Sequence, residues 1–281
     1  IAKFSRKTIR AHEDVPNQGS VSAVITSNVA IVVERSMYWG GVTRRLGGHN
    51  STGVLEAKPE WFLAEGITNP IFDQYLLLQN PNAFDVKVEV ALLGDDGVRD
   101  TLERTITANS RDTVAFRWDV GGKFLNRAFS TKVTSKTAGG NIIVERAIYW
   151  GGIFAAGLNP GGTNAAGISQ LSDTWRFAEG FAEGGKVGGF LTFLLLANPN
   201  DTDTTADVTF YLEDGTTEVV SKPLPANSRG TVWVNYDTSR AKDKPFSIVV
   251  TSRGGMPIAA ERVMYWGRDL REGHVVSGVA A

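Results

Sequence analysis

The sequence predicts an all-β protein made of tandem immunoglobulin-like antiparallel β-sandwiches with almost no helix. Short motifs return at domain-sized intervals, and strand signals alternate with turn signals at the close spacing typical of sandwiches. No stretch of about 12 residues carries a convincing helical period of apolar residues. The 281 residues leave room for two domains of the usual ~100–150 residues and part of a third.

One strand-like motif occurs three times along the chain. It reads VERSMYWGG from Val33, VERAIYWGG from Val144 and AERVMYWGR from Ala260. Its Glu stands at positions 34, 145 and 261, so the steps are 145 − 34 = 111 and 261 − 145 = 116 residues. Because such a period is the size of a whole domain rather than of one solenoid turn, we expect a string of similar domains.

Other motifs recur in two copies. WFLAEG begins at Trp61 and WRFAEG at Trp175, which are 175 − 61 = 114 residues apart. NPN returns from 80 to 198 and ANSR from 108 to 226, a shift of 118 residues in both cases. Gly-rich stretches at 151–167 and 184–189 are expected to be loops. In the later copy we expect seven strands, at residues 174–181, 190–196, 206–212, 217–221, 231–235, 246–251 and 258–266.

The beginning of the chain matches only the late half of this repeat. FSRKTI at 4–9 corresponds to NSRDTV at 109–114, and the first VERSMYWGG follows. The predicted organisation is therefore a partial, late-half repeat at residues 1–60 and full β-sandwich repeats at 61–174 and 175–281.

The chain thus contains the late half of the repeat three times and the early half only twice. Either an upstream early half is missing and the chain is an excised or processed segment, or the late half is stable with some other partner strand. Residues 1–60 carry only the expected strands at 21–27 and 30–41, too few to bury an independent core. We therefore expect this segment to pack against a second copy of the chain in a homo-oligomer or filament. The candidate self-assembly residues are Val21, Val24, Ile31 and Val33.

The recurring motif places a Glu beside an Arg in an otherwise apolar strand. Because side chains alternate across a strand, Arg146 shares the more apolar face with Trp150. A half-buried guanidinium needs an acceptor and can lie against an indole. We predict a clamp within each sandwich between the Arg and the Glu of its AEG segment. An acid–base pair of glutamates is the alternative, but no second carboxylate is placed beside the first. The predicted clamps consist of Arg146, Glu65 and Trp150, and of Arg262, Glu179 and Trp266.

No motif indicates a catalytic, cofactor or metal site, so we expect neither an enzyme nor a bound cofactor. His12, His49 and His274 are scattered, and no Cys or HExxH completes a zinc set. Hydrogen bonding in loops is the expected role of His49 and His274. DTDTTAD from Asp201 offers oxygen ligands that calcium prefers, yet it lacks the spacing and closing Glu of an EF-hand. A solvated turn is the preferred interpretation.

The charge balance argues against two classes of partner. With 29 basic and 30 acidic residues and no charged run, nucleic acid and anionic membranes are poor default partners. The longest apolar runs are too short to cross a bilayer. Seven Trp and six Tyr could line a glycan-binding face, but most occupy recurring strand positions, which is typical of core and edge aromatics.

The combination of WxxAEG, LLLxNPN, ANSRxTV and ERxxYWG resembles a tandem repeat of secreted and cell-surface proteins of actinobacteria and related thermophilic bacteria, a domain family of unknown function. The resemblance covers nearly the whole chain and implies a secreted or cell-surface location without an established catalytic residue. The predicted function is that of an extracellular structural or assembly protein, a tandem subunit of a surface filament, sheath or stalk. The alternative is an adhesin or an array of carbohydrate-binding modules.

Overall fold

The computed structural model describes residues 1–15, 19–40, 45–97, 99–120, 123–151, 161–183 and 187–281. Its contacts divide the chain into two compact units, Ile1–Ile31 and Val32–Ala281. Strands make up 54% of the structure and helix 7%, in six antiparallel sheets. The prediction of an all-β, antiparallel sandwich fold is confirmed.

The unit Ile1–Ile31 contains one helical turn, α1 (Ala11–Asp14), where the Asp14 carboxylate accepts a hydrogen bond of 2.9 Å from the backbone N–H of Arg10. No strand lies within the described residues of this unit, so the strand expected at 21–27 is absent. Val21 and Val24 are 48% and 68% exposed, and Ile31 is exposed as well. A strand is stable only where a neighbouring strand pairs with its backbone, and no strand among the described residues pairs with residues 21–27.

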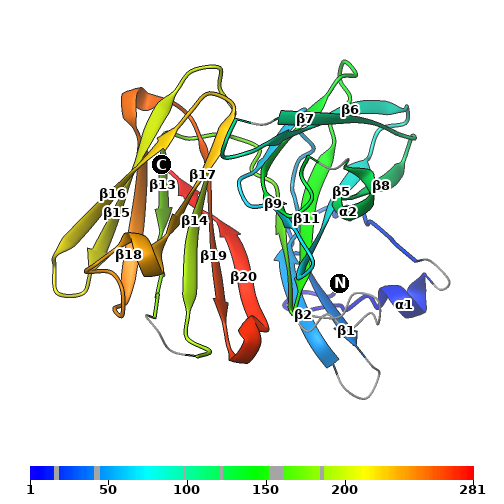
Figure 1. Cartoon of the computed structure of the whole chain (residues 1–281). Helices are drawn as coiled ribbons and strands as arrows, with labels where there is room; N and C mark the ends of the chain where they lie inside the picture. The colour runs from blue at the N-terminus through cyan, green and yellow to red at the C-terminus, as the bar shows by residue number, and fades with distance from the viewer. Residues whose placement is uncertain (16–18, 41–44, 98, 121–122, 152–160, 184–186) are drawn as a thin grey trace. The chain divides into compact units, whose positions relative to one another are not determined.

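Two sandwiches and one hairpin make up the unit Val32–Ala281 (Figure 1). The first sandwich packs the sheet β3-β10-β6-β7 against the sheet β12-β11-β5-β8. A small pair of strands, β4 with β9, and one helical turn, α2, complete it. Its elements are β3 (Glu60–Leu63), β4 (Ile67–Thr68), β5 (Phe72–Asn80), β6 (Val86–Leu93), β7 (Arg99–Ile106), β8 (Ser110–Ala115), α2 (Phe116–Asp119), β9 (Arg127–Ala128), β10 (Ser130–Ser135), β11 (Ile143–Trp150) and β12 (Gly161–Ala166).

The second sandwich repeats this order of strands, with the sheets β16-β15-β18-β13-β21 and β17-β14-β19-β20. All seven strands expected in this copy are present, and β20 and β21 follow them. Its elements are β13 (Thr174–Phe177), β14 (Leu191–Asn198), β15 (Thr204–Leu212), β16 (Thr217–Leu224), β17 (Ser228–Trp233), α3 (Val234–Asp237), β18 (Phe246–Ser252), η2 (Arg253–Gly255), β19 (Ala259–Trp266), η3 (Arg268–Leu270), β20 (Glu272–Ser277) and β21 (Val279–Ala280).

The hairpin, called the N-terminal hairpin below, consists of β1 (Glu34–Gly40) and β2 (Arg45–Thr52). It matches the pair β11–β12 of the first sandwich and the pair β19–β20 of the second. Part of the Gly-rich stretch at 151–167 is therefore a strand, β12, rather than a loop. The segments 152–160 and 184–186 lie outside the described residues.

Alternation along the strands builds each core. In β6 the inward residues Val86, Val88 and Val90 are fully buried, while the residues between them face outward. The same alternation recurs along β15 around Val208 and Phe210. Burial of one face of each sheet against the other accounts for the two-layer architecture.

The first Asn of each NPN motif holds loops in place within its sandwich. The Asn80 side chain donates hydrogen bonds of 2.8–3.0 Å to three backbone carbonyls, of Phe84, Ile106 and Thr107. Asn198 does the same in the second sandwich. These motifs recur because they satisfy buried backbone groups, a structural role.

Candidate functional site

The three copies of the Glu-Arg strand meet their neighbours at two junctions. The first junction lies between the N-terminal hairpin and the first sandwich, where Arg35 pairs with Glu145 at 2.9 Å. The second lies between the two sandwiches, where Arg146 pairs with Glu261. At both junctions the Arg of one copy of the motif binds the Glu of the next copy, so these residues connect the hairpin to the first sandwich and the first sandwich to the second.

The second junction is buried and joined by several hydrogen bonds. Nη1 and Nη2 of Arg146 lie 2.8 and 3.1 Å from the two carboxylate oxygens of Glu261, and both side chains are 0% exposed. The backbone of Glu65 completes the site: its carbonyl accepts from Arg146 at 2.8 Å, and its N–H donates to Glu261 at 2.7 Å. Two parallel bonds between a guanidinium and a carboxylate define their relative orientation.

Two further charged side chains surround this pair. Glu65 and Arg229 are 6% and 3% exposed. Burial raises the pKa of Glu65, while the charges of Arg229 and Arg146 oppose that rise. Burial alone would lower the pKa of Arg146, but the attraction and hydrogen bonds of Glu261 outweigh it and the pKa is raised. Arg146 and Arg229 attract the Glu65 carboxyl group, whereas the Glu261 carboxylate repels it and adds to the rise in its pKa. The bidentate pair of Arg146 with Glu261 is therefore the main electrostatic contact of the site.

Aromatic contacts repeat with the same geometry at both junctions. Trp39 meets Tyr149 edge to face, with ring centroids 5.3 Å apart and an interplanar angle of 89°. Trp150 meets Tyr265 at 5.2 Å and 85°. The Trp150 indole also donates a hydrogen bond of 2.7 Å to the carbonyl of Leu270. The Trp of one copy of the motif thus contacts the Tyr of the next copy, just as its Arg contacts the Glu of the next copy.

Two glycines allow this close approach of the indoles. A Cβ on Gly162 of β12 would lie 2.6 Å from the Trp39 ring, and one on Gly273 of β20 would lie 3.0 Å from the Trp150 ring. Strand β2 lies against β12, and β12 against β20. The backbone N–H of Val275 donates to the Thr163 hydroxyl at 3.3 Å across the second junction. Glycine recurs here because another ring occupies the side-chain position.

The predicted clamps have different outcomes. Arg262 does pair with the Glu179 carboxylate, at 3.1 Å, and also donates to the Glu179 carbonyl. Arg146 binds only the backbone carbonyl of Glu65, and its carboxylate partner is Glu261. The predicted pairing of Arg146 with the Glu65 side chain is therefore wrong. The second sandwich covers this end of the first and brings a better aligned carboxylate to the guanidinium.

The predicted Trp members of the clamps contact aromatic rings. Trp150 contacts Phe72 and Tyr265, which also contact each other. Trp266 lies 5.4 Å from Phe190 and 5.6 Å from His274. Of the candidate self-assembly residues, Val33 belongs to the unit Val32–Ala281, is half-buried, and accepts a hydrogen bond of 3.0 Å from Gly53. The other three lie in the unit Ile1–Ile31.

His49 and His274 occupy equivalent positions in strands, not in loops. His274 lies 2.9 Å from Nη2 of Arg262, which donates to its ring nitrogen. Neither ring nitrogen of His49 has a hydrogen-bond partner among the residues that the structure describes. Burial, followed by the charge of Arg35, lowers the pKa of His49 from 6.5 to about 4, although Glu145 opposes this shift. The neutral imidazole is therefore the form that the first junction accommodates.

We expect the N-terminal hairpin to loosen as the pH falls from about 6.5 to 4. The folded-state pKa of His49 lies below its unfolded value, so its contribution to stability is present above pH 6.5 and declines toward pH 4. Thermal unfolding of the wild type and of His49→Gln at several pH values measures the effect. The difference in Tm between the two proteins should change within this window. A constant difference from pH 7 to pH 4 would contradict the prediction.

The described residues contain no cluster of three or more His, Asp or Glu side chains suited to hold a metal ion. In the DTDTTAD segment, Asp201 accepts from Asn227 and Asp203 from a backbone N–H, as in an ordinary turn. No helix in the described part of the chain has the length and apolar character needed to span a membrane.

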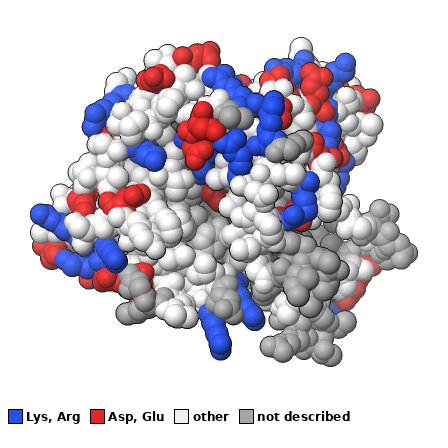
Figure 2. Space-filling view, in the orientation of Figure 1, with Lys and Arg blue, Asp and Glu red and all other residues white. Residues whose placement is uncertain are grey.

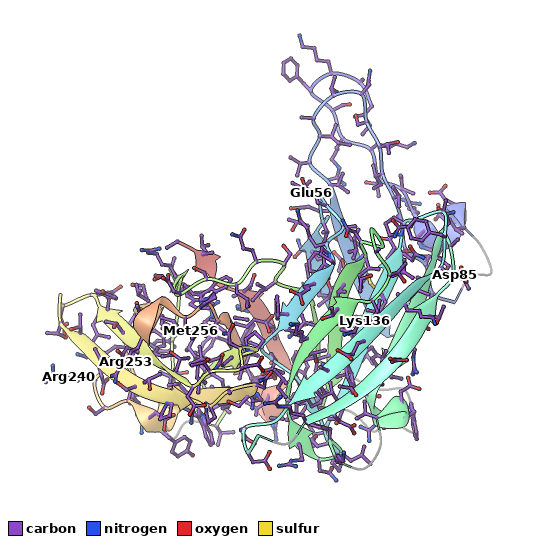
Figure 3. All side chains as sticks on the ribbon, turned by 90° about the horizontal axis from the view of Figure 1, so that it is seen from above. Glu56, Asp85, Lys136, Arg240, Arg253 and Met256 are labelled. Atoms are coloured by element: carbon purple, nitrogen blue, oxygen red, sulfur yellow. The ribbon has the colours of Figure 1, made fainter. Side chains whose placement is uncertain are left out.

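The surface charges are paired and dispersed. On the face shown in Figure 2, acidic and basic side chains lie among one another. Figure 3 places Asp85 and Lys136 on the first sandwich and Arg253 on the second, so these three charged side chains do not form one cluster. A hollow of about 400 Å³ over the sheet β3-β10-β6-β7 is lined by charged residues, among them Lys136 and Glu89, which form an ion pair of 2.9 Å. None of its described lining residues is aromatic.

The comparisons with known proteins add little. No model of a protein family matches the chain, and no curated protein matches it. Among solved structures, Thermotoga maritima 1070 is 16% identical with a TM-score of 0.33, over 41% of this chain and 96% of that one. The Anabaena sensory rhodopsin transducer is 20% identical with a TM-score of 0.29, over 34% and 99%. Red sea bream transglutaminase is 10% identical with a TM-score of 0.16, over 81% and 32%. Likenesses this weak carry no argument about function.

Proposed function

We propose that the protein is an extracellular structural subunit of a surface filament, sheath or stalk, whose repeats are joined into one stiff body. The observation that carries the proposal is the recurrence of one set of contacts at both junctions: Arg with Glu, Trp over Gly, and Trp with Tyr in the same edge-to-face geometry. A junction that recurs in one geometry gives successive repeats a constant orientation, as a fibre requires.

The chemistry of the second junction supports stiffness. Domains joined only by linkers move relative to one another, and small polar interfaces permit this. Here one buried apolar cluster runs through the second sandwich and includes Phe62, Ile148 and Trp150 of the first. The buried ion pair fixes the relative orientation of the two sandwiches, since rotating either of them would leave a buried charge without its partner. A bending joint would not be built from these contacts.

The alternative function, an adhesin or carbohydrate-binding array, has one observation in its favour. An aromatic side chain stands at the same place on the single helical turn of each sandwich, Trp118 in α2 and Tyr236 in α3. They are 77% and 72% exposed. Exposed rings of this kind stack on sugars, but neither ring lines the hollow of about 400 Å³ described above. The structural role is therefore preferred.

Antibodies against the purified chain test the proposed function. We expect them to label regular fibres or a continuous layer on intact source cells, visible by immunogold electron microscopy. Label confined to the cell interior, or a dispersed soluble protein, would contradict the proposal. A glycan-array screen with the wild type and with Trp118→Ala and Tyr236→Ala tests the alternative. Binding that both variants abolish would favour the adhesin.

A further inference from the structure

The second sandwich carries an uncovered copy of the surface that the first sandwich uses at the second junction. Phe190 and Trp266 lie 5.4 Å apart at 30°, close to the arrangement of Phe72 with Trp150 at 6.0 Å and 31°. Arg262 donates to the Glu179 carbonyl as Arg146 does to that of Glu65. This surface, called the arginine face, consists of Arg262, Trp266, Phe190, Ala178 and Glu179.

Exposure distinguishes the two copies. Ala64 and Glu65 are buried under the second sandwich, whereas Ala178 and Glu179 at the equivalent positions are exposed. The Glu179 side chain, which holds Arg262, is 70% exposed, and Arg262 itself is only 4% exposed. A buried guanidinium whose carboxylate partner extends into water can exchange that partner for one delivered by an arriving surface.

The N-terminal hairpin carries the complementary surface, also uncovered. Glu34, Tyr38 and Gly48 occupy the positions of Glu261, Tyr265 and Gly273 in the register of the hairpins. All three are exposed, and Tyr38 is 66% exposed where Tyr265 is 7%. This surface, called the glutamate face, consists of Glu34, Tyr38, Gly48 and Asn50.

The glutamate face lies on the free side of the hairpin. Because side chains alternate along β1, Arg35 and Trp39 point to the opposite side, where they bind Glu145 and Tyr149 of the first sandwich. The hairpin can therefore keep the first junction while its other side receives a partner. Each chain thus presents one arginine face and one glutamate face, as different surfaces.

We propose that the arginine face of one copy binds the glutamate face of a second copy, so that chains associate head to tail in the geometry of the internal junctions. This inference rests on the proposed structural function and names its partner. Glu34 replaces Glu179 on Arg262, and Tyr38 packs edge-on against Trp266. Contacts between two different surfaces extend without closure unless their rotation forms a ring. Association is by side-chain packing rather than by strand addition.

Cysteine pairs test the contact, and the chain contains no cysteine of its own. Thr163 and Val275 touch across the second junction, and their equivalents at the proposed contact are His274 and Asn50. Thr163→Cys with Val275→Cys should close a disulfide within one chain and calibrates the geometry. Asn50→Cys with His274→Cys should give, on mild oxidation, a ladder of linked chains beyond the dimer. Each single variant should stop at the dimer.

Sedimentation velocity of the intact chain supplies the second measurement. The weight-average mass of the wild type should rise at least twofold with concentration, and Glu34→Arg should abolish that rise. Glu34 is exposed, so this variant is expected to fold. Glu56→Arg makes the same charge change at an exposed position that follows the hairpin in the sequence, and this variant should associate like the wild type.

The outcomes separate this inference from the proposed function. A calibration disulfide that closes, together with no ladder beyond the dimer, overturns the head-to-tail contact. So does a chain that stays monomeric at every concentration. If labelled fibres are nevertheless seen on cells, the structural function stands and another repeat or protein covers the arginine face. Linked chains without surface fibres would instead retain the contact and remove the function.

Discussion

Replacing Glu261 with alanine is expected to lower the free energy of unfolding by about 3–5 kcal/mol. The change leaves Arg146 fully buried, without the two oxygens that lie 2.8 and 3.1 Å from its guanidinium. It also removes the acceptor of the Glu65 backbone N–H. An unpaired buried charge is costly because nothing replaces the water that it lost on folding. Urea unfolding followed by circular dichroism gives the measurement.

Glu179→Ala is the matched control for this variant. Glu179 pairs with the equivalent arginine, Arg262, but its side chain is 70% exposed. Its loss should cost less than the loss of Glu261, because Arg262 keeps the Glu179 carbonyl and the His274 ring nitrogen as partners and water can reach the place that the exposed carboxylate leaves. Replacing both partners at the second junction, with Arg146→Met and Glu261→Leu, should recover most of the lost stability. Equal effects of Glu261→Ala and Glu179→Ala would show that burial of the pair does not govern its contribution.

The strands could be predicted because their signals are local. Alternating apolar residues bounded by Asn, Gly and Pro mark β14 to β19 within windows of a few residues. The neighbouring strands β12 and β20 were not predicted, because they contain the dipeptides GG and EG, and a Gly-rich composition predicts a loop. Their glycines are required because an indole of the preceding copy of the motif occupies the place of a side chain, Trp39 at Gly162 and Trp150 at Gly273. That requirement comes from tertiary contact and leaves no signal in the strand itself.

The partners of Arg146 could not be derived by treating each repeat alone. A residue on a strand can face its own sandwich or the next one, and the spacing of Glu65 and Arg146 does not separate these cases. One signal in the sequence did favour the correct answer. Glu and Tyr recur on one side of the strand, and Arg and Trp on the other, in all three copies. Recurring polar and aromatic residues on both sides of a strand indicate that each side contacts the same kind of partner in every copy. In a chain of similar units, these partners are the preceding unit on one side and the following unit on the other.

Replacing Trp150 with alanine is expected to lower the free energy of unfolding by about 3–5 kcal/mol and to separate the unfolding of the two sandwiches. The Trp150 side chain is 1% exposed, packs against Phe72 and Tyr265, and donates to the carbonyl of Leu270. Its removal leaves a cavity at the second junction and an unpaired carbonyl. Cooperative unfolding of two sandwiches depends on the free energy of their shared interface, so a weakened junction lets each unfold at its own midpoint.

Differential scanning calorimetry distinguishes this uncoupling from a general loss of stability. The wild type should show one dominant transition for the unit Val32–Ala281, and Trp150→Ala should show two. Trp118→Ala removes the same side chain from a position that is 77% exposed and should change stability by no more than about 0.5 kcal/mol. A single transition in Trp150→Ala, shifted to lower temperature without broadening, would mean that the remaining contacts keep the sandwiches coupled, among them the pair of Arg146 with Glu261 and the apolar contacts of Phe62 and Ile148. The stiffness of the junction would then not depend on the Trp150 ring.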